Sequence, residues 1–296
     1  MKMIFIFIDG FGIGEDDSSK NPLKSEKARN IQYILNNFSV IPTDACLGVS
    51  GLPQSATGQT AIFTGENASK VLGRHLSGQP TVTLKKMISR SNIFSELKKR
   101  GLNVTNSNVY REEYLKMMHD PKDRLHRPSV TSVMTYSSGA QFRTTEDYNK
   151  GNGIYHDISG DILIKSGYDV ELLTPEQAAD RLYNISRHYD FTLYEHFMTD
   201  LIGHSADIKE AESVVEKLDA FLGSLLKLLN IEEDVLIITS DHGNIEDMSV
   251  KTHTYNNVPT IIIGKIPEGI KTQLKSLTDI MPFILEIFDL NKEYID

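Results

Sequence analysis

Six Asp and His side chains could bind metal ions, although they lie far apart in the chain. Asp9 follows the first apolar run of the sequence. The other five belong to the motifs DLIGH, SDHG and THT and are Asp200, His204, Asp241, His242 and His253. Histidine nitrogen and carboxylate oxygen both suit divalent zinc or manganese, and two groups of three such ligands leave positions open for a substrate. Two metal ions about 4 Å apart can stabilise the attacking and the leaving oxygen of an in-line displacement. The set therefore predicts an enzyme that acts on a phosphate-like group.

The spacing within the motifs carries part of this prediction. Asp200 and His204 are four residues apart, so a helix would project both from one face. The same spacing also fits solvated or helix-capping residues. Asp241 and His242 are neighbours that follow an apolar run and precede a glycine, so in a sharp turn they could face different ions. A histidine at the end of a buried strand needs a partner, which a metal would provide, whereas His253 carries little weight alone.

A nucleophile is predicted in the segment GLPQSATGQTAIFTG, residues 51–65, where a proline-containing turn leads into Ser55 and a short helical pattern. A hydroxyl at a helix start lies at the positive end of the helix dipole, which also favours a bound phosphate. Metal coordination could lower the pKa of the serine enough for attack. Capping of the helix would equally explain Ser55, and Thr57 and Thr60 are alternative nucleophiles.

The apolar and amphipathic patterns predict an α/β fold. Buried strands rich in Ile, Val and Phe are predicted over residues 1–9, 190–200, 234–241 and 258–264. Amphipathic helices are predicted over residues 91–101, 174–189 and 207–229. At the second helix, Thr174, Pro175 and Glu176 would take the N-cap, first-turn and capping positions. Such alternation predicts a mostly parallel central sheet with helices on both faces.

This sheet would gather the ligands. Ligands of open α/β sheets bind at the carboxyl ends of the strands. Asp9, Asp200 and Asp241 all fall at the predicted carboxyl ends of strands. Randomly placed Asp residues would not all lie at strand ends. The predicted fold and the predicted metal site therefore support each other.

The middle of the chain departs from the regular alternation. Residues 106–173 mix turns, charges and aromatic side chains, and we predict a small irregular insertion or cap there. An ordinary run of surface loops and short helices would look the same. The flanking residues 1–105 and 174–296 would form the metal-binding, phosphoryl-transfer core.

Composition excludes some classes of function. The 296 residues are 40% hydrophobic, enough to bury a substantial core, and carry a net charge of −9. That charge argues against a general binder of nucleic acids or anionic membranes, because neither polyanion would be attracted. Cys46 is the one cysteine, so no intramolecular disulfide can form, and no apolar run approaches a membrane span. We expect a cytoplasmic protein.

Taken together, the motifs IDGFGIG, SATGQTAIFTG, TDLIGH, SDHGNIED and THTYNNVP resemble the alkaline phosphatase superfamily. Within it, the chain is most similar to the branch that contains cofactor-independent phosphoglycerate mutase and phosphopentomutase. The resemblance covers about the first hundred and the last hundred and ten residues, and it implies an alkaline phosphatase-like core.

The resemblance also implies roles for the ligands and the nucleophile. One divalent ion, Mn or Zn, would be held by Asp200, His204 and His253, and the second by Asp9, Asp241 and His242. Counting back from the family's TG pair, which the sequence has at residues 64–65, makes Ser55 the nucleophile in contact with the second ion. Aligning the GLP triplet with the mutases favours Thr60 instead.

The implied reaction passes through a phosphoserine on a small phosphorylated metabolite. Water would then give a phosphomonoesterase, and return of the phosphoryl group to the substrate a phosphomutase. The short middle segment disfavours phosphoglycerate mutase itself, and ATGQ after Ser55 disfavours a sulfatase. A phosphodiesterase and a non-catalytic, metal-stabilised binding protein are the further alternatives, and the sequence does not predict the number of subunits.

Further side chains are candidates for contact with the substrate or the ligands. Arg74, His75 and Arg111, the last beside Tyr110, could bind a substrate phosphate or carboxylate. Asn244 and Glu246 could orient His242 or a water molecule. Solvated surface residues would look the same in each case.

Overall fold

The protein is described from a computed structural model that covers residues 1–120, 122 and 127–293. Its centre is a six-stranded sheet in the order β2-β6-β5-β1-β4-β3. The strands are β1 (Lys2–Ile8), β2 (Ser39–Thr43), β3 (Val104–Asn106), β4 (Phe191–His196), β5 (Asp234–Thr239) and β6 (Val258–Ile263). Strand β1 pairs in parallel with β4 and β5, and β3 with β4, whereas β6 runs antiparallel to both β2 and β5. The predicted mostly parallel sheet is confirmed.

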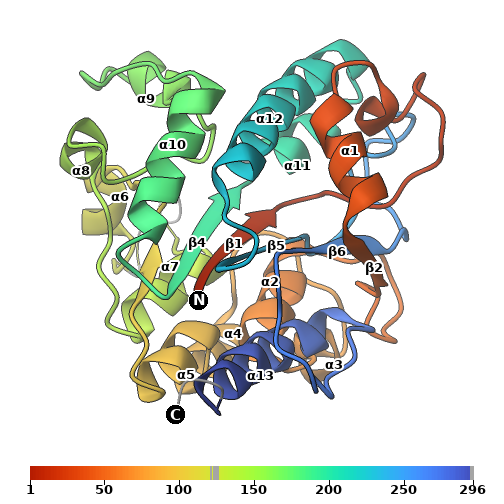
Figure 1. Ribbon diagram of the computed structural model, residues 1–296. Coiled ribbons are helices and arrows are strands. Elements are labelled where there is room, and N and C mark those ends of the chain that lie inside the picture. The colour runs from red at the N-terminus through yellow and green to blue at the C-terminus, as the bar shows by residue number, and fades with distance from the viewer. Residues whose placement is uncertain (121, 123–126, 294–296) are drawn as a thin grey trace.

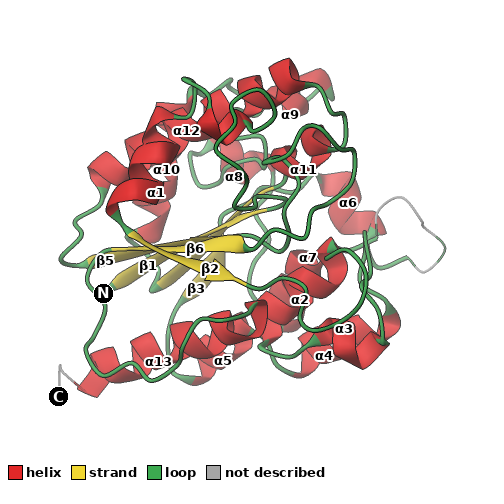
Figure 2. Ribbon diagram, turned by 90° about the vertical axis from the view of Figure 1, so that its right-hand side faces the viewer, coloured by secondary structure: helices red, strands yellow, loops and turns green. Residues whose placement is uncertain are grey.

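Helices cover both faces of this sheet, as the edge-on view in Figure 2 shows. One layer contains α1 (Arg29–Asn37), α10 (Pro175–Ser186) and α12 (Ile208–Leu228), and the other contains α2 (Ser55–Thr64), α4 (Val82–Arg90), α5 (Ile93–Lys99), α7 (Val130–Ser137) and α13 (Ile280–Glu293) (Figure 1). Short helices complete the described chain: α3 (Ala68–Leu72), α6 (Glu112–Met117), α8 (Thr145–Asn149), α9 (Asp161–Lys165), α11 (Met198–Gly203) and the 3-10 turns η1 (Pro22–Lys24) and η2 (Leu277–Asp279).

The apolar sequence of β1 explains its central position. Alternate side chains point to opposite faces of a strand. Met3 and Phe5 accordingly join the core with α2 and α13, while Ile4 and Ile6 join the core with α10 and α12. Because β1 is buried on both faces, it must lie between neighbouring strands and between the two helix layers.

Helix boundaries follow the predicted signals, with one difference in detail. Helix α10 begins after Thr174, whose side chain accepts a hydrogen bond from the backbone of Gln177. Gln177 bonds back to Thr174, so it completes the capping box in the position predicted for Glu176. The glutamate lies one residue too early, because the reciprocal bond requires the third helical residue.

The described part of residues 106–173 packs against the rest of the chain. Val109, Tyr148 and Ile158 belong to the same apolar core cluster as Ile4 of β1. The division of the chain into a core and an insertion remains a prediction. Among the described residues, no helix is both long enough and apolar enough to cross a membrane.

Candidate active site

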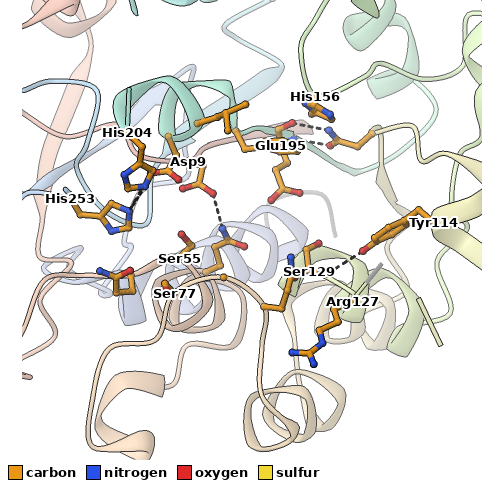
Figure 3. Close-up of a pocket in the computed structure, with 18 of the residues that line it drawn as sticks. Asp9, Ser55, Ser77, Tyr114, Arg127, Ser129, His156, Glu195, His204 and His253 are labelled. Atoms are coloured by element: carbon orange, nitrogen blue, oxygen red, sulfur yellow. Dashed lines mark hydrogen bonds and ion pairs between the residues drawn. The ribbon is translucent and has the colours of Figure 1, made fainter. Parts of the chain in front are cut away.

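The carboxyl edge of the sheet brings all six predicted ligands together. Strand β1 ends immediately before Asp9, and strand β5 ends shortly before Asp241 and His242. Strand β4 leads into α11, which carries Asp200, with His204 at its C-terminal end. The sixth ligand, His253, lies in the loop before β6. Figure 3 shows His204, His253 and Asp9 on one side of a cavity, above Ser55.

Asp200, His204 and His253 lie together in a first group. The Nε2 atom of His253 lies 3.3 Å from Oδ1 of Asp200, and Nε2 of His204 lies 3.5 Å from the same oxygen. One ligand atom from each residue lies within 4.8 Å of the others, a spacing that fits binding of a single ion.

The two histidines of this group bring their Nε2 atoms together. The Nδ1 atoms of His204 and His253 lie 2.9 Å and 2.7 Å from the carbonyl oxygens of Lys251 and Pro53. A carbonyl only accepts, so each Nδ1 donates, and Nε2 is the ring nitrogen left to face the other ligands. Those two Nε2 atoms are only 3.2 Å apart. Two ring nitrogens this close to each other and to Oδ1 of Asp200 form a donor set that fits a metal ion.

The second group surrounds His242. Its Nε2 lies 3.2 Å from Oδ1 of Asp9 and 3.6 Å from Oδ2 of Asp241. Oδ1 of Asp9 is buried and, apart from this contact with His242, has no polar partner among the described residues. Asp9, His242 and Asp200 also bring ligand atoms within 4.8 Å of one another, so Asp200 lies within reach of both groups. The sequence assigned Asp200 to the first group alone.

The pKa values of the side chains in this cluster indicate that it favours a bound positive charge. Burial, with the nearby charge of Asp241, raises the pKa of Asp9 to about 7, and burial raises the pKa of Asp241 to about 6. Burial alone would lower the pKa of His242, but the charges of Asp241 and Asp9 raise it to about 10. Burial also acts to raise the pKa of Asp200, but a hydrogen bond from His253 and the charge of His242 outweigh it and lower that pKa. A divalent cation would let all these carboxylates ionise.

Polar side chains hold the carboxylates in place. Nε2 of Gln59 donates to Asp9 (3.1 Å) and to Asp241 (3.2 Å). The amide of Asn244 donates to Oδ1 of Asp200 at 2.7 Å, so it orients a predicted ligand, although not His242. Glu246 instead accepts from the backbone of Gly12 and Asn244 and from the side chains of Thr254 and Asn256. Its contacts tie loops together, and none of them reaches a predicted ligand.

Among the three candidate hydroxyls, Ser55 faces the cavity. Its Oγ lies 3.0 Å from Nε2 of His242. Thr57 and Thr60 are fully buried, and their hydroxyls donate to the carbonyls of Gln54 and Ala56. The N-cap of α2 is the residue before Ser55, so capping does not explain the serine. The Ser55 hydroxyl contacts His242, a predicted metal ligand, instead of the helix backbone.

The cavity has a volume of about 810 Å³, in the range of small-molecule sites. Arg111 lines it, as do Arg127 and Lys251, which the sequence did not single out. Arg74 and His75 do not line it. Both ring nitrogens of His75 bond within the protein, to Ser69 and to the carbonyl of Val49. The structure thus brings one of the three predicted substrate anchors to the site.

Glu195 is a further cavity residue that the sequence did not reveal. It lies one residue before the end of β4, is 8% exposed, and accepts a 2.6 Å hydrogen bond from Thr131 of α7. Asn108 bonds to its backbone N–H (2.8 Å) and carbonyl (2.7 Å), which fixes the strand end against residues 106–173. Burial raises the pKa of Glu195 to about 7. Its signal in the sequence was an acidic residue within a strand that has no other acidic residue.

The metal-free Glu195→Gln variant is expected to be more stable than wild type at pH 8, by up to about 3 kcal/mol. The folded state holds the Glu195 proton more tightly than the unfolded state, because burial raises the pKa from 4.5 to about 7. Wild type therefore loses stability relative to the variant as pH rises from about 4.5 to 7. Urea unfolding at several pH values measures the difference, with the exposed Glu176→Gln as control. A difference independent of pH would contradict the burial argument.

A family model and solved structures match nearly the whole chain. The model described as "Metalloenzyme superfamily" matches residues 1–292. The chain belongs to the metalloenzyme superfamily. A protein of Pyrococcus horikoshii, PH0037, aligns over 97% of this chain and 96% of its own, with a TM-score of 0.60 and 15% identity. Alkaline phosphatase from the Antarctic bacterium TAB5 aligns over 98% of both chains, with a TM-score of 0.55 and 12% identity. The predicted alkaline phosphatase-like fold is confirmed.

Curated relatives of this metalloenzyme match over a shorter stretch. The 2,3-bisphosphoglycerate-independent phosphoglycerate mutase of Ehrlichia ruminantium (strain Gardel) is 32% identical over 111 residues, which are 35% of this chain and 22% of that protein. The mutase of Dinoroseobacter shibae is 32% identical over 130 residues, 40% of this chain and 26% of its own length. The matched stretch thus spans about a quarter of these relatives. The predicted likeness to the mutase branch is confirmed, while the reaction is a separate question.

Proposed function

We propose that this metalloenzyme is a two-metal phosphomonoesterase of small phosphorylated metabolites, with Ser55 as its nucleophile. One observation carries the proposal: Oγ of Ser55 lies 3.0 Å from Nε2 of His242, at the edge of a six-residue ligand cluster that opens into a cavity. A structural metal site would need neither the hydroxyl nor the cavity.

The residues divide into two sets of ligands. Asp200, His204 and His253 would hold one divalent ion, Mn or Zn, and Asp9, Asp241 and His242 would hold the other. When bound, such ions neutralise the phosphate oxygens and favour an ionised serine.

The chain's own groups position the reaction. The start of α2 directs Ser55 and the positive end of the helix dipole toward the phosphate. Attack by the Ser55 oxygen forms one P–O bond as the ester P–O bond breaks, and the alcohol leaves with a proton. Water then attacks the phosphoserine, which releases inorganic phosphate and restores the serine hydroxyl.

A phosphomutase is the second candidate, and the names of the curated relatives favour it. Hydrolysis ranks first because exposed residues line part of the cavity, among them Ser77, Gln79 and Lys251, so water can reach the intermediate. A phosphodiesterase and a non-catalytic binding protein rank lower, as do nucleic-acid and membrane partners. A cytoplasmic location remains a prediction.

Phosphorus NMR distinguishes these functions. The manganese-loaded and the zinc-loaded protein would each be incubated with sugar phosphates, phosphoglycerates and nucleotides. A growing signal of inorganic phosphate is expected. Conversion of one ester signal into another without free phosphate would identify a mutase, and no change across the panel would favour the non-catalytic alternative.

Replacing Arg111 with Met is expected to raise KM about tenfold or more while kcat changes little. Arg111 is half-buried at the cavity and pairs with no acidic group among the described residues, so an anionic substrate can take that place. Arg74→Met is the matched control, because Arg74 is exposed and outside the cavity. Steady-state kinetics on the best substrate checks this, and equal effects of the two substitutions would rule out the anchor.

A further inference from the structure

An aromatic ledge lines the cavity next to the ligand cluster. It consists of Tyr155, His156, Phe197 and Leu201, all of which border the cavity. The rings of His156 and Phe197 stack with centroids 3.8 Å apart and planes inclined by 23°. The Tyr155 ring lies 4.1 Å from that of His156. The facing sides of His156 and Phe197 thus cover each other and Tyr155 is buried, so Phe197 is the ring of the ledge that keeps the most exposed surface at the cavity.

Part of this ledge stays exposed although it is apolar. Phe197 keeps 36% of its surface exposed and Leu201 keeps 56%. Exposed apolar side chains in a concave site, beside a few polar groups, are typical of a surface that a ligand covers. Burial holds the pKa of His156 well below its ordinary value, so its imidazole stays neutral. The ledge thus offers stacking without charge.

The ledge continues the helical surface that carries two of the predicted metal ligands. Phe197 is the N-cap of α11, and Leu201 lies one helical turn later. Asp200 and His204 follow at the same three- to four-residue spacing, so all four side chains share one side of this helix. Figure 3 shows His156 beside Glu195, on the far side of the cavity from His204 and His253. A phosphate ester bound at Ser55 would therefore extend its leaving group over the ledge.

We propose that the aromatic ledge stacks the base of a nucleoside 5′-monophosphate, which makes mononucleotides the substrate class of this site. The proposal rests on the proposed phosphomonoesterase function. A planar heterocycle matches stacked rings better than an aliphatic chain does, because each base has a π-face for stacking. The cavity of about 810 Å³ is large enough for a ligand of this size.

Two substrates with the same leaving oxygen test the ledge. Adenosine 5′-monophosphate and ribose 5-phosphate both release a primary sugar alcohol, so they differ at the base and not at the reacting bond. Wild type is expected to show kcat/KM at least about tenfold higher for the nucleotide. Phe197→Leu keeps the apolar volume but removes the ring, and should bring the ratio toward one by lowering kcat/KM for the nucleotide more than for ribose 5-phosphate.

A second variant controls for damage to the ligand cluster. Phe197 lies three residues before Asp200, so metal content is measured for every variant. His156→Leu removes the other stacked ring and should also reduce the preference. Equal kcat/KM for the two substrates in wild type would overturn the ledge and leave the phosphomonoesterase proposal standing.

If neither substrate turns over, calorimetry decides the inference separately. Nucleotide binding at least about tenfold tighter than ribose 5-phosphate binding, lost in Phe197→Leu, would support the ledge although the proposed reaction had failed. Equal affinity for both compounds, or no binding of either, would overturn the ledge.

Discussion

Ser55→Ala is expected to lower kcat by at least about 10⁴-fold, which corresponds to about 5 kcal/mol of transition-state stabilisation. Ser55 is the candidate hydroxyl that lines the cavity and contacts a predicted ligand, at 3.0 Å from Nε2 of His242. Without it, the phosphoryl group has no side chain to attack from this position. Release of phosphate from the best substrate measures the effect, and trapping of phosphoserine in acid-quenched wild type should fail in the variant.

The two neighbouring threonines supply the controls for this prediction. Thr57→Ser and Thr60→Ser keep hydroxyls that bond to helix carbonyls, so both variants should retain most activity. Ser55→Ala should keep both metal ions, because its hydroxyl belongs to neither group of three ligands. Full activity in Ser55→Ala with its metal retained would move the nucleophile to Thr57 or Thr60.

Asp200→Asn is expected to weaken metal binding by more than about 100-fold and to remove most activity. Asp200 is the predicted ligand within 4.8 Å of both groups, so a single substitution disturbs both sites. Oδ1 of Asp200 also accepts a hydrogen bond from the amide of Asn244. In the variant, the amide of Asn244 would face a second amide instead of a carboxylate. Metal content by mass spectrometry and phosphate release together measure the loss.

Substitution of a carboxylate away from the site separates this effect from a general loss of acidic charge. Asp180 is exposed on α10, and Asp180→Asn should keep both the metal and the activity. If Asp200→Asn bound metal as tightly as wild type, the proposed assignment of ligands would be wrong.

The ligand cluster was predictable because its signal is local in the sequence. Asp9 directly follows the apolar residues 3–8, and Asp241 comes shortly after the apolar residues 235–238. The carboxyl ends of neighbouring parallel strands meet at one edge of the sheet. The long helix α12 was predictable for a similar reason, since its amphipathic spacing runs unbroken from Ile208 to Leu228. The fold and the gathering of the six side chains followed from such patterns.

The remainder of the site depends on contacts between distant segments, which a local pattern does not encode. Glu195 lies in the cavity because Thr131 of α7 and Asn108 meet it at the end of β4. Arg74 looked as suitable as Arg111 in the sequence, but Arg74, in the loop after α3, is exposed and does not line the cavity. The choice of Ser55 over Thr60 likewise depends on which side of α2 faces His242.

The pairing of β1 with β4 and β5 has a consequence for folding of the newly made chain. Met3 pairs with Phe191 and Val235. Both neighbouring strands of β1 are therefore synthesised long after β1 itself. Contacts so distant in sequence form slowly, and an unpaired apolar strand is prone to aggregate meanwhile. The six ligands meet only after these strands have paired. Binding of a metal ion by the full set of predicted ligands would therefore be a late event in folding.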